Sequence, residues 1–552
     1  MGEITGGRLI GKALKAEGVK YIFTLNGGHI YNIFEGWEEE GIKIIDVRHE
    51  QVAGHAAEGW SRVTRTPGVA VVTAGPGVTD TVTAVANAYQ APSPMVVIGG
   101  NGSVRDWLSG GLQEFDSVTL MRSITNWSEQ CATTNRLPDF VATAFRWATT
   151  GKLGPSYLEV PMDVINNRVE EDQVVFPTRS RTQARSPGDL ELIKDAAKIL
   201  AEAKHPVVMA GSDVWWCDAA AELRAFVEMI KAPVFLNGMG RGSIPPDHPN
   251  VGAQSRRFAM TQADAVMLIG VPLDFRLSFG RSTLIPSDAK VIHIMMDGHE
   301  IGRNRAIDVG IIGNARVILQ QLMDTLPGAG IEPTDDWLEK VQEEERGFKA
   351  GDEEMIKSDA DPIHPMRLVG EIRNFLDPDA TIVGDGGDIV TFGARVIRIN
   401  EPGHWLDPGQ FGCLGVGTGF AMAAQLARPG KQILLLNGDG AWGLNGMDME
   451  TMVRFKLPVV SVVSNNGGWG QTIHGVKRAY GRALGCYLDQ NTRYDKMVEA
   501  MGGHGELVEH PDQIRPALER AFASGLPACI NVLTDPEASY GTMPGRSQKR
   551  IS

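Results

Sequence analysis

The stretch GDGAWGLNGMDMETMVRFKLPVVSVVSNN, residues 438–466, decides the fold. An apolar run, QILLL, stands just before it, and a second run, VVSVV, ends just before its two closing asparagines. The residues between the runs predict a helix over about 445–455, so the runs are predicted to be parallel strands joined by a right-handed crossover. This connection places both strand ends at one edge of the sheet, where open α/β sheets bind ligands.

Two oxygen-bearing side chains stand at these strand ends. Asp439 follows the first strand and Asn466 follows the second. Carboxylate, amide and backbone carbonyl oxygens, completed by phosphate oxygens and water, are ligands that Mg²⁺ prefers. The glycines beside Asp439 let the backbone approach a phosphate, and the following helix offers unpaired N–H groups. GDG alone is a common turn and NN alone a common loop. Together, in this context, they predict a site for Mg²⁺ and a diphosphate.

The alternation of short apolar runs and helical patterns occurs in three blocks. The block 1–168 contains VAVVTAG and SPMVVIGG, the block 189–327 contains HPVVMAG and ADAVMLIG, and the block 366–552 contains ATIVGDGGD and the opening stretch. Polar and charged segments between the blocks are typical of linkers. The predicted fold class is therefore α/β, with three domains that are each a mainly parallel sheet flanked by helices.

Composition narrows the class of protein. A chain of 552 residues is too long for one hydrophobic core, and its formal net charge of −14 argues against nucleic acid or an anionic membrane as the main partner. The five cysteines show no metal-ligand spacing, which fits reduced thiols. The first residues lack the apolar core of a signal peptide, and no apolar run approaches the roughly 20 residues that span a bilayer. We expect a cytoplasmic protein with a small-molecule substrate.

GDG followed at this distance by NN resembles the metal motif of the thiamine diphosphate-dependent enzymes. The resemblance covers nearly the whole chain, in the order pyrimidine-binding, middle and diphosphate-binding domain. It implies Mg²⁺ on Asp439, Asn466 and the carbonyl of Gly468. It also implies that Leu414 supports the bent cofactor and that the carbonyl of Gly412 accepts from its amino group. The full set of cofactor-binding residues that it implies is Thr73, Gly387, Asp388, Gly412, Leu414, Gly440 and Ala441.

Glu50, in the stretch IIDVRHEQVAGHAAEG, follows an apolar strand and precedes a helix rich in alanine and glycine. It matches the catalytic glutamate of the family, which hydrogen-bonds the cofactor's pyrimidine. The alternative is an ordinary carboxylate at a helix N-terminus. In the family, this glutamate and the metal site come from different subunits. The resemblance therefore implies a homodimer or homotetramer with active sites shared between subunits.

Two further residues bear on the reaction. The stretch FTLNGGHIYNIF puts His29 after a strand and resembles benzaldehyde lyase, which also has a histidine here. An imidazole can move the proton of a substrate hydroxyl, and the alternative is a core histidine. Gln113, in GGLQEFD, matches a glutamine of acetolactate synthases and benzaldehyde lyase and is a candidate donor to the substrate oxygen.

The overall resemblance is to acetolactate synthase-like proteins that shade into 2-hydroxyacyl-CoA lyases. We expect a carbon–carbon lyase or ligase that cleaves a 2-hydroxyacyl-CoA reversibly to formyl-CoA and an aldehyde or ketone. The alternative is an acyloin-forming carboligase of acetolactate synthase or benzaldehyde lyase type, without CoA. A third possibility is a non-catalytic thiamine-fold protein, against which the presence of Glu50, Asp439 and Asn466 argues.

Substrate contacts are predicted in two segments. Trp469 and His474 follow the metal loop, and the basic tail YGTMPGRSQKRIS carries Tyr540 and Arg546, which would cover the pocket and meet CoA phosphates. A frayed terminus is the alternative for the tail. The middle domain is a candidate site for ADP or CoA, and whether it binds FAD, as true acetolactate synthases do, stays open. Candidate ligands there, if they are not ordinary surface arginines, are Arg241, Arg276, Arg281 and Arg303.

Overall fold

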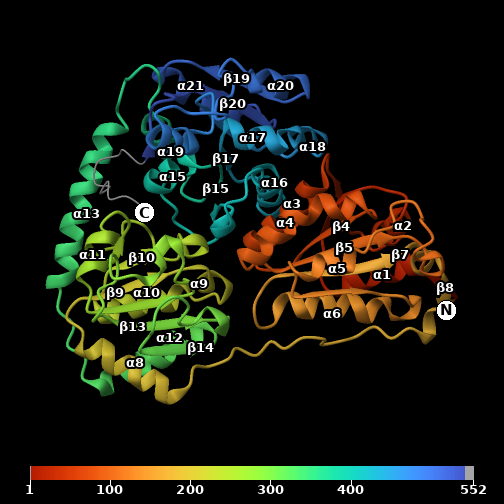
Figure 1. Cartoon of the computed structure of the whole chain (residues 1–552), viewed down its shortest axis with the longest axis horizontal. Helices are drawn as coiled ribbons and strands as arrows, with labels where there is room; N and C mark the ends of the chain where they lie inside the picture. Colours follow the sequence, from red (N-terminus) through yellow and green to blue (C-terminus); the bar gives the residue numbers. More distant parts are fainter. Residues whose placement is uncertain (1, 541–552) are drawn as a thin grey trace.

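A computed structural model describes residues 2–540. It contains three six-stranded sheets, each with all strands parallel and helices on both faces (Figure 1). The predicted α/β, three-domain architecture is therefore confirmed. The strands are short runs of buried Val, Ile, Leu and Ala, as expected for parallel sheets covered on both sides.

The first sheet has the order β3-β2-β4-β5-β7-β6. Its strands are β2 (Tyr21–Leu25), β3 (Lys43–Asp46), β4 (Gly68–Val72), β5 (Met95–Asn101), β6 (Trp127–Gln130) and β7 (Pro155–Pro161). The covering helices are α1 (Gly6–Ala16), α2 (Tyr31–Glu39), α3 (Glu50–Thr64), α4 (Pro76–Gln90), α5 (Ser117–Arg122) and α6 (Leu137–Thr149). The functional residues predicted in this block all follow strands, at the carboxyl edge of the sheet.

The second sheet has the order β11-β10-β9-β12-β13-β14. Its strands are β9 (Pro206–Ala210), β10 (Val234–Leu236), β11 (Val251–Gly252), β12 (Ala265–Ile269), β13 (Lys290–Met295) and β14 (Val309–Ile312). Its helices are α8 (Leu190–Glu202), α9 (Ser212–Trp216), α10 (Ala220–Ile230), α11 (Arg256–Gln262) and α12 (Ala315–Thr325). The loops that follow β9, β10, β12 and β13 turn toward the other two domains.

The third sheet has the order β16-β15-β17-β18-β20-β19. Its strands are β15 (Thr381–Asp385), β16 (Trp405–Leu406), β17 (Ile433–Gly438), β18 (Val460–Asn465), β19 (His504–Val508) and β20 (Ala528–Leu533). Its helices are α14 (Pro365–Phe375), α15 (Asp388–Val396), α16 (Gly417–Ala427), α17 (Asp439–Asn445), α18 (Met449–Arg454), α19 (Gly470–Tyr480), α20 (Tyr494–Ala500) and α21 (Ile514–Ala523).

The opening stretch folds differently from the prediction in one respect. The single helix expected over about 445–455 is wrong. The chain enters α17 directly at Asp439, passes through a 3-10 turn at Gly446–Asp448 and continues as α18. The seven residues of α17 include two glycines and a tryptophan, a poor helix composition, and the helix is held by burial of Ala441 and Trp442 rather than by propensity. Asp439 is therefore the first residue of a helix.

The predicted linkers contain ordered structure. The charged segment after the second block forms α13 (Asp336–Met355), whose Trp337 packs into the middle-domain core. Its buried Glu345 accepts hydrogen bonds of 2.9–3.0 Å from the backbone N–H groups of residues 253–255. At the end of the first block, β8 (Arg168–Glu170) pairs antiparallel with β1 (Glu3–Thr5). These contacts fasten both connections to neighbouring domains.

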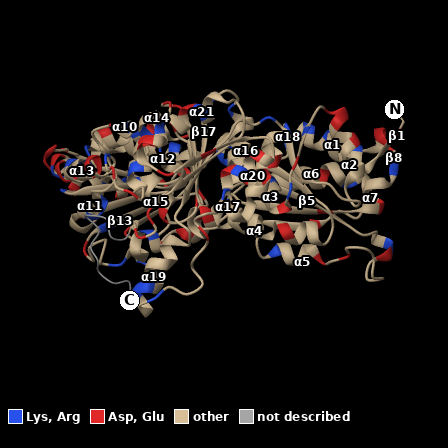
Figure 2. Ribbon diagram, turned by 90° about the horizontal axis from the view of Figure 1, so that it is seen from above, with Lys and Arg blue, Asp and Glu red and all other residues tan. Residues whose placement is uncertain are grey.

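The first and third domains pack through α3 and α16, which lie side by side (Figure 1). Acidic and basic side chains are interspersed over all three domains (Figure 2). Within residues 2–540, no helix combines the length and the apolar character that crossing a bilayer requires.

Candidate active site

Three neighbouring strand ends build the centre of the site in the third domain. β15, β17 and β18 are adjacent, with Asp385 paired to Asn437 and Gly438 paired to Ser464. Because the strands end level, the loops that follow them meet at one edge. The helices α15, α17 and α19 all begin there. Helix N-termini present unpaired N–H groups and a partial positive charge, which favours an anion such as a diphosphate.

Asp439 lies at the middle of this edge and is 2% exposed. Its Oδ1 accepts from the N–H of Gly440 at 2.9 Å, and its Oδ2 accepts from the N–H of Gly468 at 3.0 Å. Burial raises the pKa of Asp439 to about 6, and these backbone donors lower it only in part. No ion pair to Asp439 exists within residues 2–540. A bound cation would offset the cost of keeping this carboxylate charged.

Asn466 and Trp469 lie beside this aspartate. A methyl group added at Gly470 would lie 2.6 Å from Asn466 Nδ2, and one added at Gly440 would lie 2.5 Å from the ring of Trp469. The glycines therefore leave the space that these two side chains occupy. The structure places Trp469 against the start of α17 and Asn466 against the start of α19, and the roles predicted for them in metal and substrate binding stay predictions.

The turn after β15 borders the same place. Gly387 caps α15, Asp388 begins it, and a methyl group at Gly387 would lie 2.8 Å from Gln471 Oε1 at the start of α19. Asp385, which the sequence reasoning gave no role, is buried and accepts from the N–H groups of Gly415 and Gly417 at 3.1 and 2.8 Å. Burial raises the pKa of Asp385 to about 6. Asp385 thus fixes the loop that carries Gly412 and Leu414.

Gly412 and Leu414 lie in that loop at the start of α16. Gly412 ends a 3-10 turn with φ +66°, and an added methyl group would meet no atom within 4 Å. Leu414 is half-buried, between the buried Cys413 and Gly415. The side of this loop that carries Gly412 is therefore open, which is compatible with the predicted contact to a cofactor.

These donors fit Mg²⁺ and a diphosphate. Asp439, Asn466 and the Gly468 carbonyl supply three hard oxygen atoms, and the converging helix N-termini would hold phosphate oxygens. In the described part of the chain, no three His, Cys, Asp or Glu side chains gather into a metal centre. A magnesium site would therefore depend on this mixed set and on the diphosphate itself.

A second group of predicted residues lies at the carboxyl edge of the first sheet. Glu50 is the first residue of α3 and is partly buried, and burial raises the pKa of its carboxyl. A methyl group at Gly77 would lie 2.8 Å from Thr73 Cγ2 and 3.7 Å from Glu50 Oε1. The Oγ1 of Thr73 is buried and has no hydrogen-bond partner within residues 2–540. Such an unsatisfied group is typical of a site that awaits a polar ligand.

His29 and Gln113 belong to the same edge. His29 is 5% exposed and packs against β5, where a methyl group at Gly100 would lie 2.8 Å from its Cβ. Its Nδ1 is buried and makes no hydrogen bond to the described residues. Gln113 lies over Gly75 at the start of α4, with φ +59°. The structure thus places His29, Glu50, Thr73 and Gln113 after β2, β3, β4 and β5 respectively, at one edge of the sheet.

Within one chain, the first and third domains touch near both edges, but not through Glu50 or Asp439. The N–H of Arg48, just before α3, donates to Asp448 Oδ1 at 2.9 Å. This contact reaches the turn before α18 rather than the start of α17. Within residues 2–540, no hydrogen bond or ion pair joins Glu50 to Asp439 or Asn466. Among the described residues of one chain, no direct bond therefore joins the two halves of the predicted site.

The remaining substrate predictions have mixed outcomes. His474 lies on α19, and its Nε2 is buried without a hydrogen-bond partner in residues 2–540. Tyr540 packs against Phe392 with ring centroids 5.3 Å apart, toward the far end of α15 from Asp388. Arg546 lies outside the described residues.

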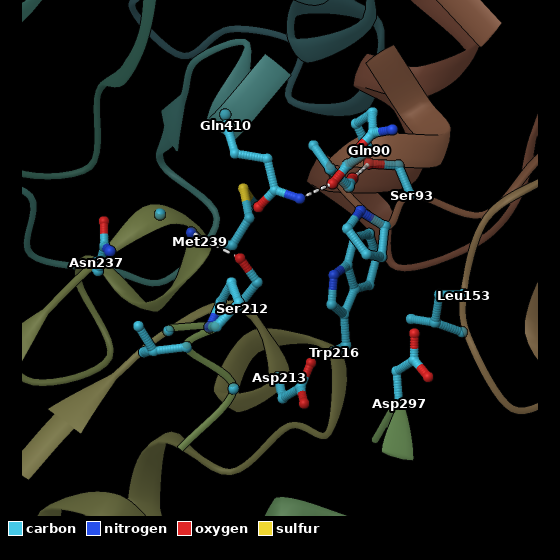
Figure 3. Close-up of a pocket in the computed structure, with 18 of the residues that line it drawn as sticks. Gln90, Ser93, Leu153, Ser212, Asp213, Trp216, Asn237, Met239, Asp297 and Gln410 are labelled. Atoms are coloured by element: carbon cyan, nitrogen blue, oxygen red, sulfur yellow. Dashed lines mark hydrogen bonds between the residues drawn. The ribbon is translucent and has the colours of Figure 1, made fainter. Parts of the chain in front are cut away.

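A pocket opens at the junction of all three domains (Figure 3). Its floor is the carboxyl edge of the second sheet, and Trp216 projects into it between the domains. Asp213, Asp297 and Glu300 form an acidic side. Of the four predicted middle-domain arginines only Arg276 lines this pocket. The first domain contributes Gln90 and Ser93 to this lining, and the third domain contributes Gln410. The sequence did not predict these contributions, because no motif marks the three positions.

The other three arginines do not line this pocket. Arg241 turns to the third domain, where it donates to the Ala394 carbonyl at 3.2 Å and lies over Trp405. Arg281 lies over Phe279, and Arg303 pairs with Glu300. Each guanidinium thus has a local partner, and spacing along the sequence could not reveal which way the side chains turn.

A family model matches part of each of the three domains. The N-terminal TPP binding domain of thiamine pyrophosphate enzymes matches residues 4–120, the central domain matches 193–322, and the C-terminal TPP binding domain matches 385–532.

Curated relatives agree with this family. The chain is 42% identical to a "Probable acetolactate synthase" of Mycobacterium bovis over 536 residues, covering 97% of this chain and 96% of that protein. It is 33% identical to the "2-hydroxyacyl-CoA lyase 2" of Homo sapiens over 577 residues, covering 96% and 90%. A "Probable acetolactate synthase large subunit" of Methanocaldococcus jannaschii is 30% identical over 556 residues, covering 98% and 93%. With the three sheets and the two edges described above, these matches show that the chain belongs to the thiamine pyrophosphate enzyme family.

Proposed function

We propose that the protein is a thiamine diphosphate-dependent carbon–carbon lyase that cleaves a 2-hydroxyacyl-CoA reversibly to formyl-CoA and an aldehyde or ketone. The observation that carries this proposal is the buried His29 imidazole, whose Nδ1 lacks a partner among residues 2–540, at the same sheet edge as Glu50. Cleavage next to a hydroxyl carbon requires removal of the hydroxyl proton as the carbon–carbon bond breaks, and a histidine placed at the substrate supplies that base.

The cofactor, when bound, supplies a nucleophilic carbon that stabilises negative charge during cleavage. Asp439, Asn466 and the Gly468 carbonyl would hold Mg²⁺, and the N-termini of α15 and α19 would hold the diphosphate. Glu50 would hold a proton at the pyrimidine, and burial, which raises the pKa of its carboxyl, favours that role. Gln113 would donate to the substrate oxygen.

A second candidate is an acyloin-forming carboligase of acetolactate synthase type, which joins two 2-oxo acids with loss of carbon dioxide. The observation that favours it is the 42% identity to a protein that bears the name acetolactate synthase. The same Glu50 and metal site would serve both reactions. The two candidates differ in whether the substrate is a thioester and in whether His29 takes or gives the proton of a hydroxyl.

The three-domain pocket supports a nucleotide as a further ligand, in the form of FAD or ADP. Asp297 and Glu300 follow β13, where carboxylates can accept from ribose hydroxyl groups. CoA carries a phosphate on that ribose, which Asp297 would repel, whereas Glu300 is already paired with Arg303. Coenzyme A of a thioester substrate would therefore bind elsewhere. Equilibrium dialysis with ADP, FAD and CoA tests this, and tighter binding of CoA than of ADP would contradict it.

We also propose a homodimer or homotetramer in which two chains complete each active site. Within residues 2–540 of one chain, no hydrogen bond or ion pair joins Glu50 to Asp439, which supports this. Apolar side chains left in solvent near both halves support it too. Leu108 and Leu112 are 80% exposed beside Gln113, and Leu444 and Met447 are 53% and 55% exposed after the metal turn.

The reaction is tested by offering a 2-hydroxyacyl-CoA, benzoin and pyruvate to the protein with thiamine diphosphate and Mg²⁺. Formyl-CoA with a matching carbonyl product supports the lyase, and acetolactate from pyruvate alone supports the second candidate. The variant His29→Phe tests whether His29 is the base. The lyase proposal predicts that it cleaves the thioester about 100-fold more slowly and still binds the cofactor. A His29→Phe protein that cleaves at the wild-type rate would remove the observation that carries the proposal.

A further inference from the structure

A buried polar contact joins helix α3 to the loop before α16. His55 lies on α3, little more than one turn after Glu50, and is 0% exposed. Its Nε2 lies 3.9 Å from the Sγ of Cys413, a residue that is distant in sequence and belongs to the third domain. Cys413 stands between Gly412 and Leu414 in the loop described above.

The same imidazole contacts the first turn of its own helix. Gln51 Nε2 lies 3.3 Å from His55 Nε2, and Gln51 is the residue next to Glu50. Because an amide nitrogen can only donate, Nε2 is the acceptor in this arrangement and the ring proton lies on Nδ1. The contact with Cys413 then has the thiol as its donor, and the same thiol also lies 3.4 Å from the Leu414 carbonyl. Nδ1 faces Glu58 Oε2 at 3.8 Å, which is too long for a hydrogen bond, and it is buried without a hydrogen-bond partner in residues 2–540.

The partners on the Glu58 side are firmly held. Glu58 accepts from Asn87 Nδ2 at 3.0 and 2.9 Å and pairs with Arg62 at 2.8 Å, and all these side chains are buried. The ring of Phe420 on α16 meets His55 edge-on, with centroids 6.0 Å apart. His55 therefore packs between the Glu58 cluster and Phe420, and it touches the loop through a single nitrogen.

We propose that His55 is a positioning residue that holds the Glu50 turn of α3 in register with the Gly412–Leu414 loop. A shift of either segment would separate Nε2 from Gln51 or from Cys413, and buried polar groups resist such separation because it leaves them unpaired. The inference rests on the roles proposed for Glu50 and Leu414. In the proposed dimer, Glu50 and Leu414 of one chain belong to two neighbouring active sites. His55 would therefore connect one site to the other.

Amide hydrogen exchange on the cofactor-free protein tests the contact apart from any activity. In His55→Phe, which keeps a ring of similar size, peptides covering 47–58 and 409–416 should both exchange at least about fivefold faster. The matched control is His293→Phe. His293 is also 0% exposed but bonds to the Val271 carbonyl in the middle domain, so its loss should leave those two peptides unchanged.

A conservative variant separates positioning from simple packing. His55→Gln keeps a polar atom near the position of Nε2, and it should restore slow exchange in both peptides. In the holoenzyme, His55→Phe should lower kcat at least about tenfold and His55→Gln should recover most of it. Exchange in His55→Phe that changes in neither peptide, or only in 47–58, would overturn the proposal.

If His55→Phe does not fold, Cys413→Ala decides the question from the other side. This change removes the thiol and leaves every α3 side chain in place. Faster exchange in both peptides would support the coupling, and faster exchange in 409–416 alone would overturn it. Neither exchange result depends on which substrate the enzyme takes, so failure here is distinguishable from failure of the proposed reaction.

Discussion

Asp439 Oδ2 accepts a 3.0 Å hydrogen bond from the backbone N–H of Gly468. One carboxylate therefore connects the start of α17 to the loop after β18 before any cation binds. The proposed metal ligands are held close together by the protein itself, and binding of Mg²⁺ and diphosphate would need little rearrangement.

Asp439→Asn is expected to weaken Mg²⁺-dependent binding of thiamine diphosphate by about 100-fold or more, since loss of a ligand exceeds the 10–100-fold effect of outer-shell changes. Titration calorimetry measures this directly. Asp448→Asn is the matched control, because Asp448 is also buried, has a pKa that burial raises to about 6, and bonds to Arg48 and Thr451 instead. An equal loss of cofactor affinity in Asp439→Asn and Asp448→Asn would argue against Asp439 as a metal ligand.

The stabilisation of the folded protein by Mg²⁺ and thiamine diphosphate should depend on pH. Burial raises the pKa of Asp439 from 3.8 to about 6, so between these values the folded protein binds more protons than the unfolded chain. The contribution of Asp439 to the free energy of unfolding therefore falls as pH rises through that window. Above about pH 6 the carboxylate is ionised in both states, and the full destabilisation of the folded protein is reached. Mg²⁺ needs the ionised form, so its affinity should fall about tenfold per pH unit below 6.

The measurement is the shift in Tm on adding Mg²⁺ and thiamine diphosphate. We expect a larger shift at about pH 7.5 than at about pH 5, and a small, pH-independent shift in Asp439→Asn. Equal shifts at both pH values in the wild type would show that Asp439 does not bind the cation in its ionised form.

Two glycines in α17 provide a matched pair. A methyl group at Gly440 would lie 2.5 Å from the Trp469 ring, whereas one at Gly443 meets no atom within 4 Å. Gly440→Ala should displace Trp469 and weaken cofactor binding at least about tenfold. Gly443→Ala should leave binding unchanged and stabilise the helix by up to about 1 kcal/mol. Intrinsic tryptophan fluorescence and calorimetry report the two effects, and unchanged binding in Gly440→Ala would contradict the close approach.

Sequence patterns predicted the parts of the site that follow apolar strands. β17 and β18 end beside Asp439 and Asn466 as expected, because buried parallel strands are continuous apolar runs. The edge strand β19 was missed, since its sequence HGELV is only partly buried and includes charge. The start of α17 was missed because tertiary packing overrides a glycine-rich composition. The contact of His55 with Cys413 leaves no local signal, since it depends on how α3 and α16 pack.

Shared active sites predict complementation. Glu50→Gln and Asp439→Asn should each be nearly inactive alone. In a mixed dimer of the two, one active site carries both changes and the other carries neither, so random mixing should restore about a quarter of wild-type activity. The variants must be unfolded and refolded together, and each variant refolded alone is the control. No recovery, with mixed dimers demonstrated by mass spectrometry, would place Glu50 and Asp439 of one chain in the same site.

The most direct test of the proposed site is the rate of proton exchange at the thiazolium carbon of bound thiamine diphosphate, measured by NMR in wild-type protein and Glu50→Gln. If Glu50 holds a proton at the pyrimidine, the exchange rate should fall at least about 100-fold in Glu50→Gln, while the affinities for Mg²⁺ and cofactor stay within about threefold. An unchanged exchange rate with cofactor bound would contradict the assignment of Glu50 and the catalytic site built around it.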